Sequence, residues 1–188
     1  MFIVAGLPGA GKSKAFPVAG FGVDFFNADD RAAALNGGSY LNIPRRIRDE
    51  INILFESFVL DHIERRASCA FETTLRSAIT FDQAAIARRA GFMIEMRYVA
   101  LRDFPMHLER VKMRAEAGGH SAPESILRTI YESSVGNLPR AIQEMDLLHV
   151  YDNSGWGVTP KVLLQAEQGE VVYLADQIPD WLARIVSH

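Results

Sequence analysis

The stretch "GLPGAGKS", residues 6–13, decides the fold. It has glycine, four residues, glycine, lysine and serine in order, and it directly follows the apolar run "FIVAG" at 2–6. Glycines let main-chain amides turn inward around phosphate oxygens, and a helix starting there points its positive end at the same anion. The stretch therefore predicts a strand, a phosphate-binding loop and a helix. The residues assigned to the loop are Gly6, Leu7, Pro8, Gly9, Ala10, Gly11, Lys12, Ser13 and Lys14.

Two side chains of this loop carry chemistry. Lys12 can reach the outer phosphates of ATP or GTP, and the Ser13 hydroxyl is the expected ligand of Mg²⁺. Pro17 stands only five positions after Lys12. Because a proline inside a helix removes a hydrogen bond and costs ~3 kcal/mol or more, we expect the helix after the loop to be one or two turns long.

Length and composition narrow the class of protein. The chain has 188 residues, 48% of them hydrophobic, which suits a single domain over 1–188. The formal net charge is -3, without the basic excess typical of nucleic-acid binding, so nucleic acid is not expected as a partner. One cysteine, Cys69, excludes an internal disulfide. No signal peptide is visible and no apolar run approaches the ~18 residues of a membrane span, so we expect a cytoplasmic protein without a membrane partner.

Strand and helix patterns alternate along the chain. Apolar runs at 2–6, 23–26, 69–72, 92–101 and 147–152 predict short strands, with helical patterns between them. This order predicts an α/β fold of three layers around a mainly parallel five-stranded sheet. The segment 160–175 is expected to add a C-terminal β-hairpin, and 179–186 a last short helix.

Helix ends are also marked in the sequence. Thr80 and Gln83 fit a capping box, and Gly91 fits the stop of the same helix. Ser121, with Glu124 three residues later, fits the start of another helix. We expect Gly118 and Gly119 to end the helix before it.

Carboxylates follow two of the predicted strands. The second strand runs into "NADD", 27–30, and the third ends in "FETT", 71–74. Because ligands of an open α/β sheet bind beyond the carboxyl ends of its strands, Asp29 is the candidate base that accepts a proton from an attacking hydroxyl. Asp30 is interpreted as a residue of the helix start. Glu72, with Thr73 beside it, is the candidate that anchors substrate hydroxyls or a metal-bound water.

Arginines gather in the segment 107–134. Arg110 and Arg114 lie four residues apart on one helix face, and Arg128 lies on the next helix, beyond the glycines. Arginines on a mobile lid can stabilise the charge of a transferring phosphoryl group. The alternative is a solvated face paired with nearby glutamates. His120 is the histidine beside the turn, where a structural role is the simpler interpretation and substrate binding the other.

Five stretches together resemble the zeta-toxin family of P-loop kinases, in particular its chromosomal members. They are "GLPGAGKS", "FFNADD", "FETT", "RVKMRAEAGGHSAPESI" and "YDNSG", and they extend over Val4–Gly155. The resemblance implies transfer of the γ-phosphate of ATP or GTP to a hydroxyl of a small molecule. The acceptor of the best-known family members is the UDP-sugar UDP-N-acetylglucosamine, and a small antitoxin protein commonly blocks their nucleotide site.

The resemblance also implies roles for single residues. Asp29 matches the catalytic base and Lys12 the phosphate-binding lysine. Glu72 and Thr73 match the substrate-side motif. Arg114, with Arg128 as a second candidate, matches the charge-stabilising arginines, and Asn153 falls near the nucleotide base.

One position departs from the family pattern. Relatives often have an arginine just before the tyrosine of the second lid helix, where this chain has Ile130. The nearest arginine, Arg128, faces about 200° away on an α-helix.

Two other functions stay open at this stage. One is a nucleotide-dependent ATPase or switch without an acceptor, although the chain lacks the Asn-Lys-x-Asp guanine reader of GTPases. The other is a kinase of nucleic-acid ends, with "RRIRDE" and "ERRA" as a basic rim. We favour the small-molecule kinase.

Overall fold

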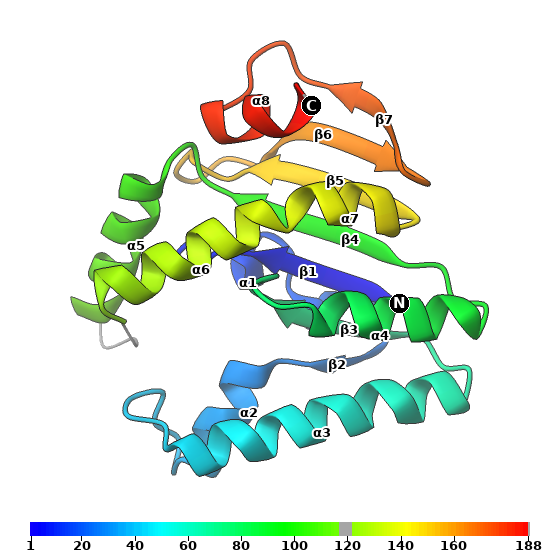
Figure 1. Cartoon of the computed structure of the whole chain (residues 1–188). Coiled ribbons are helices and arrows are strands. Elements are labelled where there is room, and N and C mark those ends of the chain that lie inside the picture. The colour runs from blue at the N-terminus through cyan, green and yellow to red at the C-terminus, as the bar shows by residue number, and fades with distance from the viewer. Residues whose placement is uncertain (117–121, 188) are drawn as a thin grey trace.

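The computed structural model describes residues 1–116 and 122–187. The predictions for Gly118, Gly119, His120 and Ser121 lie outside these residues. Within them, the strands form one seven-stranded sheet in the order β2-β3-β1-β4-β5-β6-β7 (Figure 1). The strands are β1 (Phe2–Gly6), β2 (Asp24–Phe26), β3 (Cys69–Thr73), β4 (Glu95–Ala100), β5 (Leu147–Asp152), β6 (Lys161–Glu167) and β7 (Glu170–Leu174).

The pairing confirms the predicted architecture. β1 to β5 are parallel neighbours, whereas β6 and β7 add an antiparallel hairpin beside β5. The helices are α1 (Lys12–Ala15), α2 (Ala28–Leu35), α3 (Arg45–Glu64), α4 (Ile79–Arg89), α5 (Phe104–Glu116), α6 (Glu124–Gly136), α7 (Leu138–Glu144) and α8 (Asp180–Val186). A 3-10 helix, η1 (Val18–Phe21), follows α1, which is short as Pro17 predicts.

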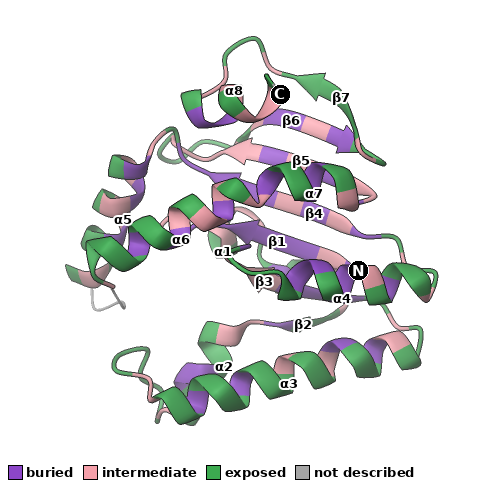
Figure 2. Cartoon of the chain, in the orientation of Figure 1, coloured by how far each residue is buried: buried purple, intermediate pink, exposed green. Residues whose placement is uncertain are grey.

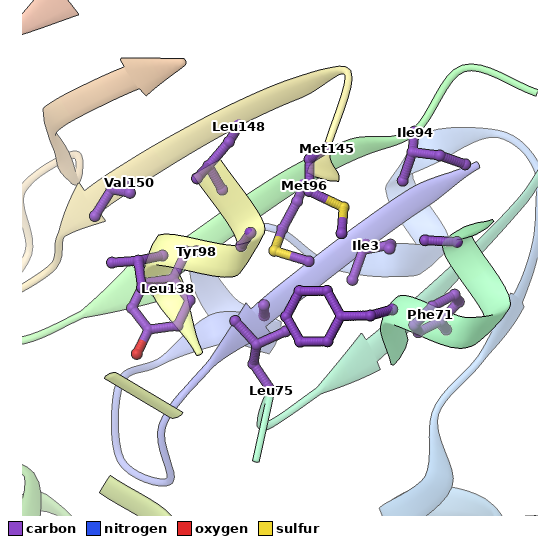
Figure 3. Packing of buried hydrophobic residues seen from close by; sticks show 14 of the residues in the cluster. Ile3, Phe71, Leu75, Ile94, Met96, Tyr98, Leu138, Met145, Leu148 and Val150 are labelled. Carbon is purple, nitrogen blue, oxygen red and sulfur yellow. The ribbon is translucent and has the colours of Figure 1, made fainter. Parts of the chain in front are cut away.

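Helices α4, α6 and α7 lie along one face of the sheet (Figure 1). Apolar residues of α4 and α7 pack there on Ile3, Phe71, Met96 and Leu148 in one large core cluster, part of which Figure 3 shows. On the other face, Val4 and Ala70 pack against Val18 of η1. The central strands β1 and β4 are accordingly buried along most of their length (Figure 2), as parallel strands covered on both sides should be.

One predicted helix start is wrong, and another is confirmed, since Asp30 lies in the first turn of α2. α4 begins at Ile79 with Ala78 at its N-cap and no side-chain cap, so Thr80 and Gln83 form no capping box. Thr80 lies in the first turn, and its hydroxyl pairs with that of Thr73 at 3.2 Å. At α2 the cap is Asn27, whose Oδ1 accepts from the amides of Asp29 and Asp30. The asparagine therefore caps the helix and leaves both aspartate side chains in its first turn.

The topology places the functional loops together. β1 and β4 are neighbours, and the chain leaves β1 toward β2 on one side of this pair but leaves β4 toward β5 on the other side. The segments that follow β1 and β4 therefore diverge and leave a crevice at the carboxyl edge of the sheet. Among the residues that the structure describes, no helix combines the length and apolar character needed to cross a membrane.

Candidate functional site

Lys12 is the first residue of α1, at the end of the loop that follows β1. Its Nζ donates to the carbonyl oxygens of Gly6 at 2.9 Å and Leu7 at 3.4 Å. Burial lowers the pKa of Lys12, while the nearby carboxylates of Glu72 and Asp29 oppose that shift and Arg114 adds to it. The ammonium group thus shares one cavity with Asp29 and Arg114, which the sequence assigned to catalysis, and with Glu72, which it assigned to the substrate.

Ser13 and Glu72 meet beside this lysine. The Ser13 hydroxyl donates to Oε2 of Glu72 at 3.1 Å, whereas Oε1 of Glu72 is buried and accepts from no described group. Burial raises the pKa of Glu72, and the charge of Lys12 and the Ser13 hydrogen bond act against it. An orphaned carboxylate oxygen next to a hydroxyl suits Mg²⁺, which prefers oxygen ligands and keeps several waters.

The described side chains alone would not form a complete metal cage. Among residues 1–116 and 122–187, no group of three or more His, Cys, Asp and Glu side chains is arranged to hold a metal ion. Such a sparse set fits Mg²⁺ bound largely through phosphate oxygens and water.

Asp29 and Asp30 point to different surroundings. Asp29 lines the cavity that also contains Lys12 and Glu72. The carboxylate of Asp30 instead accepts a hydrogen bond from the Tyr40 hydroxyl at 2.9 Å. The structure therefore brings Asp29, not Asp30, to the crevice.

The cavity has a volume of about 420 Å³. Its phosphate end is lined by Pro8, Lys12, Asp29, Glu72 and Arg114, and Thr73 lies next to Glu72. A larger cavity of about 1400 Å³ lies between α6, α7, β7 and α8, but no residue of the phosphate loop lines it. The smaller cavity is the one where the chemistry can take place.

The three arginines are placed differently. Arg114 lines the 420 Å³ cavity. Arg110 donates to the carbonyl oxygens of Asn153 and Ser154, each at 2.9 Å, and its guanidinium stacks on Trp156 at 4.7 Å. Arg128 pairs with Glu124 at 3.1 Å and stacks on Phe104 at 4.4 Å. The structure thus brings only Arg114, of these three, to Lys12 and Asp29.

Asn153 lies under the phosphate loop. Its Nδ2 donates to the carbonyl oxygen of Ala10 at 2.8 Å. Its backbone amide donates to the carbonyl oxygen of Ala100 at 2.9 Å. The side chain is therefore engaged with the loop backbone itself.

Sequence reasoning missed several cavity residues. Arg76 and Ser77 line it from the segment that follows β3, and Arg48 and Asn52 line it from α3. Extending the strand-end argument by four residues beyond Thr73 would have found the first pair. Arg48 belongs to the stretch "RRIRDE" of the nucleic-acid alternative, but neither Arg48 nor Asn52 was assigned to this cavity. Their spacing of four on a helix is equally typical of a solvated face.

The segment after β3 has a constrained backbone. Leu75 is fully buried with a φ of 58°, a conformation that costs a non-glycine residue free energy. Its amide donates to the Thr73 hydroxyl at 3.1 Å, and its carbonyl oxygen accepts from the Asn137 side chain at 2.8 Å. These bonds hold Thr73 and Arg76 on either side of the constrained residue.

Comparison with known proteins identifies the fold. No protein-family model matches the sequence, and no curated protein is significantly similar to it. The structure is similar to AvrRxo1-ORF1 in its complex with AvrRxo1-ORF2, solved with sulphate ions and with ATP, at a TM-score of 0.67 and 15% identity in both cases. The similarity covers 98% and 99% of this chain, which spans only 62% and 61% of those chains.

Two further structures agree. A chain of the PezAT chromosomal toxin-antitoxin system of Streptococcus pneumoniae has a TM-score of 0.60 at 15% identity, covering 92% of this chain and 69% of that one. A candidate kinase from Chloroflexus aurantiacus has a TM-score of 0.54 at 16% identity, covering 71% and 76%. The fold is therefore the α/β fold of P-loop kinases, with a mostly parallel sheet and added antiparallel strands.

Proposed function

We infer that this protein is a P-loop kinase that transfers the γ-phosphate of ATP or GTP to a hydroxyl group of a small molecule. The observation that carries the inference is the 420 Å³ cavity, in which Lys12 from the phosphate loop meets Asp29, Glu72 and Arg114 from three other segments. A nucleotide whose outer phosphates bind the loop would present its γ-phosphate at the end of this cavity. The rest of the cavity then remains for an acceptor.

The proposed reaction uses the groups of this chain as follows. The acceptor oxygen attacks the γ-phosphorus while the bond to the β-γ bridging oxygen breaks, releasing the nucleoside diphosphate. Asp29 takes the proton that the acceptor hydroxyl loses. Lys12 and Arg114 stabilise the negative charge on the phosphoryl group during transfer.

Ser13 and Glu72 would hold Mg²⁺, which when bound neutralises the charge of the outer phosphates. The raised pKa of Glu72 and its orphaned oxygen support this assignment, because a cation beside the carboxylate would offset the cost of its burial. Thr73, beside Glu72, orients the acceptor.

For the acceptor we propose a class of compound. A UDP-sugar such as UDP-N-acetylglucosamine is the candidate that the zeta-toxin resemblance supports, and its negative charge suits Arg48 and Arg76 on the cavity wall. A small antitoxin protein that blocks the nucleotide site is the corresponding partner. The PezAT neighbour belongs to a toxin-antitoxin system, and AvrRxo1-ORF1 was solved together with AvrRxo1-ORF2, which supports a search for such a partner.

The test is incubation of the protein with Mg²⁺, labelled ATP and a metabolite extract, followed by mass spectrometry of phosphorylated products. The proposal expects a new phosphate monoester that is absent without the protein. Hydrolysis of ATP that no metabolite accelerates would contradict it and favour an ATPase or switch. Labelling confined to oligonucleotide ends, in parallel reactions with RNA and DNA, would favour the nucleic-acid kinase.

A further inference from the structure

The phosphate loop is held from outside by two side chains. His107 of α5 contacts the carbonyl oxygen of Pro8 through Nδ1 at 3.2 Å. Asn153, after β5, contacts the carbonyl oxygen of Ala10 through Nδ2 at 2.8 Å. These two carbonyls belong to the peptide units that join Pro8 to Gly9 and Ala10 to Gly11.

The chemistry of His107 is fixed by its neighbours. Its Nε2 lies 3.1 Å from the backbone amide of Leu101, which can only donate, so Nε2 is the acceptor. The ring proton therefore lies on Nδ1 and is donated to Pro8. Only 3% of His107 is exposed, and burial lowers its pKa to about 4, which keeps this neutral form.

Because a peptide unit is planar, a hydrogen bond to its carbonyl oxygen also fixes the direction of the amide in the same unit. In a planar trans peptide the C=O and N–H groups point in opposite directions. A carbonyl held outward at Pro8 thus turns the amide of Gly9 toward the inside of the loop, and Ala10 does the same for Gly11. Within the described chain, no group accepts a hydrogen bond from either amide, so both are available to an anion.

The two clamped peptides also explain why glycine stands at 9 and 11. Their φ angles are +80° and +79°. A Cβ on Gly9 would lie 2.8 Å from the carbonyl oxygen of His107, and one on Gly11 would lie 2.7 Å from Nδ2 of Asn153. The clamping residues pack directly against the loop, with no space for a side chain between them.

We propose that His107 and Asn153 are positioning residues that hold two peptide planes of the loop so that the amides of Gly9 and Gly11 face the bound phosphates. The inference rests on the phosphate-binding part of the proposed function. It adds that the anion site is shaped by side chains from α5 and from the segment after β5. Because α5 also carries Arg114, His107 ties the loop and that arginine into one unit.

Two substitutions separate the two bonds of the histidine. The amide of His107→Asn reaches the position of Nδ1 and can still donate to Pro8. The amide of His107→Gln reaches the position of Nε2 and can still accept from Leu101. Each variant keeps one buried hydrogen bond. If His107 only stabilised the fold, the two substitutions would therefore lower the affinity for tripolyphosphate to the same extent.

The measurement is calorimetric binding of inorganic tripolyphosphate to the full chain, with melting temperatures recorded in parallel. We expect the two variants to melt at similar temperatures, but the Gln variant to bind tripolyphosphate about tenfold more weakly than the Asn variant. Asn153→Leu should weaken binding at least as much, whereas Gln165→Leu on β6, which also replaces a side-chain amide by leucine but lies away from the loop, should not. Equal affinities of the Asn and Gln variants would overturn the proposal.

The probe keeps this result apart from the kinase reaction. If wild type binds tripolyphosphate but phosphorylates no alcohol, the proposed kinase activity is rejected, while the Asn and Gln variants still test the positioning role of His107. If wild type phosphorylates an acceptor and the two variants bind tripolyphosphate equally, the positioning role is rejected and the proposed kinase activity is retained.

Discussion

Because His107 of α5 is buried, the folded protein should become less stable as the pH falls. His107 has an ordinary pKa of 6.5 when the chain unfolds and a pKa of about 4 in the folded protein. Between these values the unfolded chain binds more protons than the folded one. The stability that neutral His107 contributes is therefore fully present above pH 6.5 and is lost as the pH falls toward 4. Charging the ring would also place an N–H on Nε2 opposite the amide of Leu101.

The size of the effect follows from the shift. Integrating the proton uptake gives a loss of about 2 kcal/mol in the free energy of unfolding between pH 7 and pH 5, and about 3 kcal/mol in total. For a chain of this size, about 2 kcal/mol corresponds to a fall of roughly 4–8 °C in melting temperature. Other groups titrate in the same range, and the raised pKa of Glu72 acts with the opposite sign, so a variant must isolate the histidine.

The assay is urea unfolding followed by circular dichroism at pH 5, 6 and 7, for wild type and for His107→Gln. Glutamine cannot gain a proton, so the variant should lose about 2 kcal/mol less than wild type between pH 7 and pH 5. If both proteins lose the same free energy over that interval, His107 is not held neutral by burial. The assigned tautomer would then lose its support.

Three further predictions, made with four variants, test the site. Arg114→Gln should lower kcat about 10²-fold or more, whereas Arg128→Gln, which breaks a surface pair with Glu124, should change kcat less than threefold; steady-state kinetics of both variants check the contrast, and equal losses would contradict it. Ser13→Ala should raise the Mg²⁺ concentration needed for half-maximal rate with little change in melting temperature, and an unchanged metal titration would remove Ser13 from the metal site. Gly11→Ala should weaken ATP binding and destabilise the fold by about 1 kcal/mol or more, because its Cβ would lie 2.7 Å from Asn153; calorimetry and thermal melts measure both, and wild-type values would refute the packing.

Local sequence signals predicted most of the fold. Each parallel strand lies in a short, mainly apolar stretch, and the loop after the first strand has the glycine-lysine-serine spacing of a phosphate-binding loop. Pro17 correctly predicted a short α1, because the restriction it imposes is local. The predicted start of α4 was wrong because Thr80 and Gln83 match the residue types of a capping box without forming one. The hydroxyl of Thr80 instead pairs with that of Thr73, and Thr80 lies inside the helix.

The site was predictable where its residues follow strands. Asp29 and Glu72 could be placed because parallel strands end at one edge of the sheet. Arg48 and Asn52 could not, since their helix reaches the cavity only through the packing of α3 beside α2 and β2. His107 was equally hidden, because its partners, Pro8 and Leu101, are set by the fold and not by its neighbours in sequence.

The kinase proposal depends on one carboxylate acting as base, and a matched pair of variants tests it. Asp29 and Asp30 are adjacent in the first turn of α2, but only Asp29 lines the cavity with Lys12. With the acceptor found in the metabolite screen, single-turnover phosphate transfer should slow about 10²- to 10⁴-fold in Asp29→Asn and less than threefold in Asp30→Asn, with ATP affinity retained in both. Equal rates in Asp29→Asn and wild type would contradict the account.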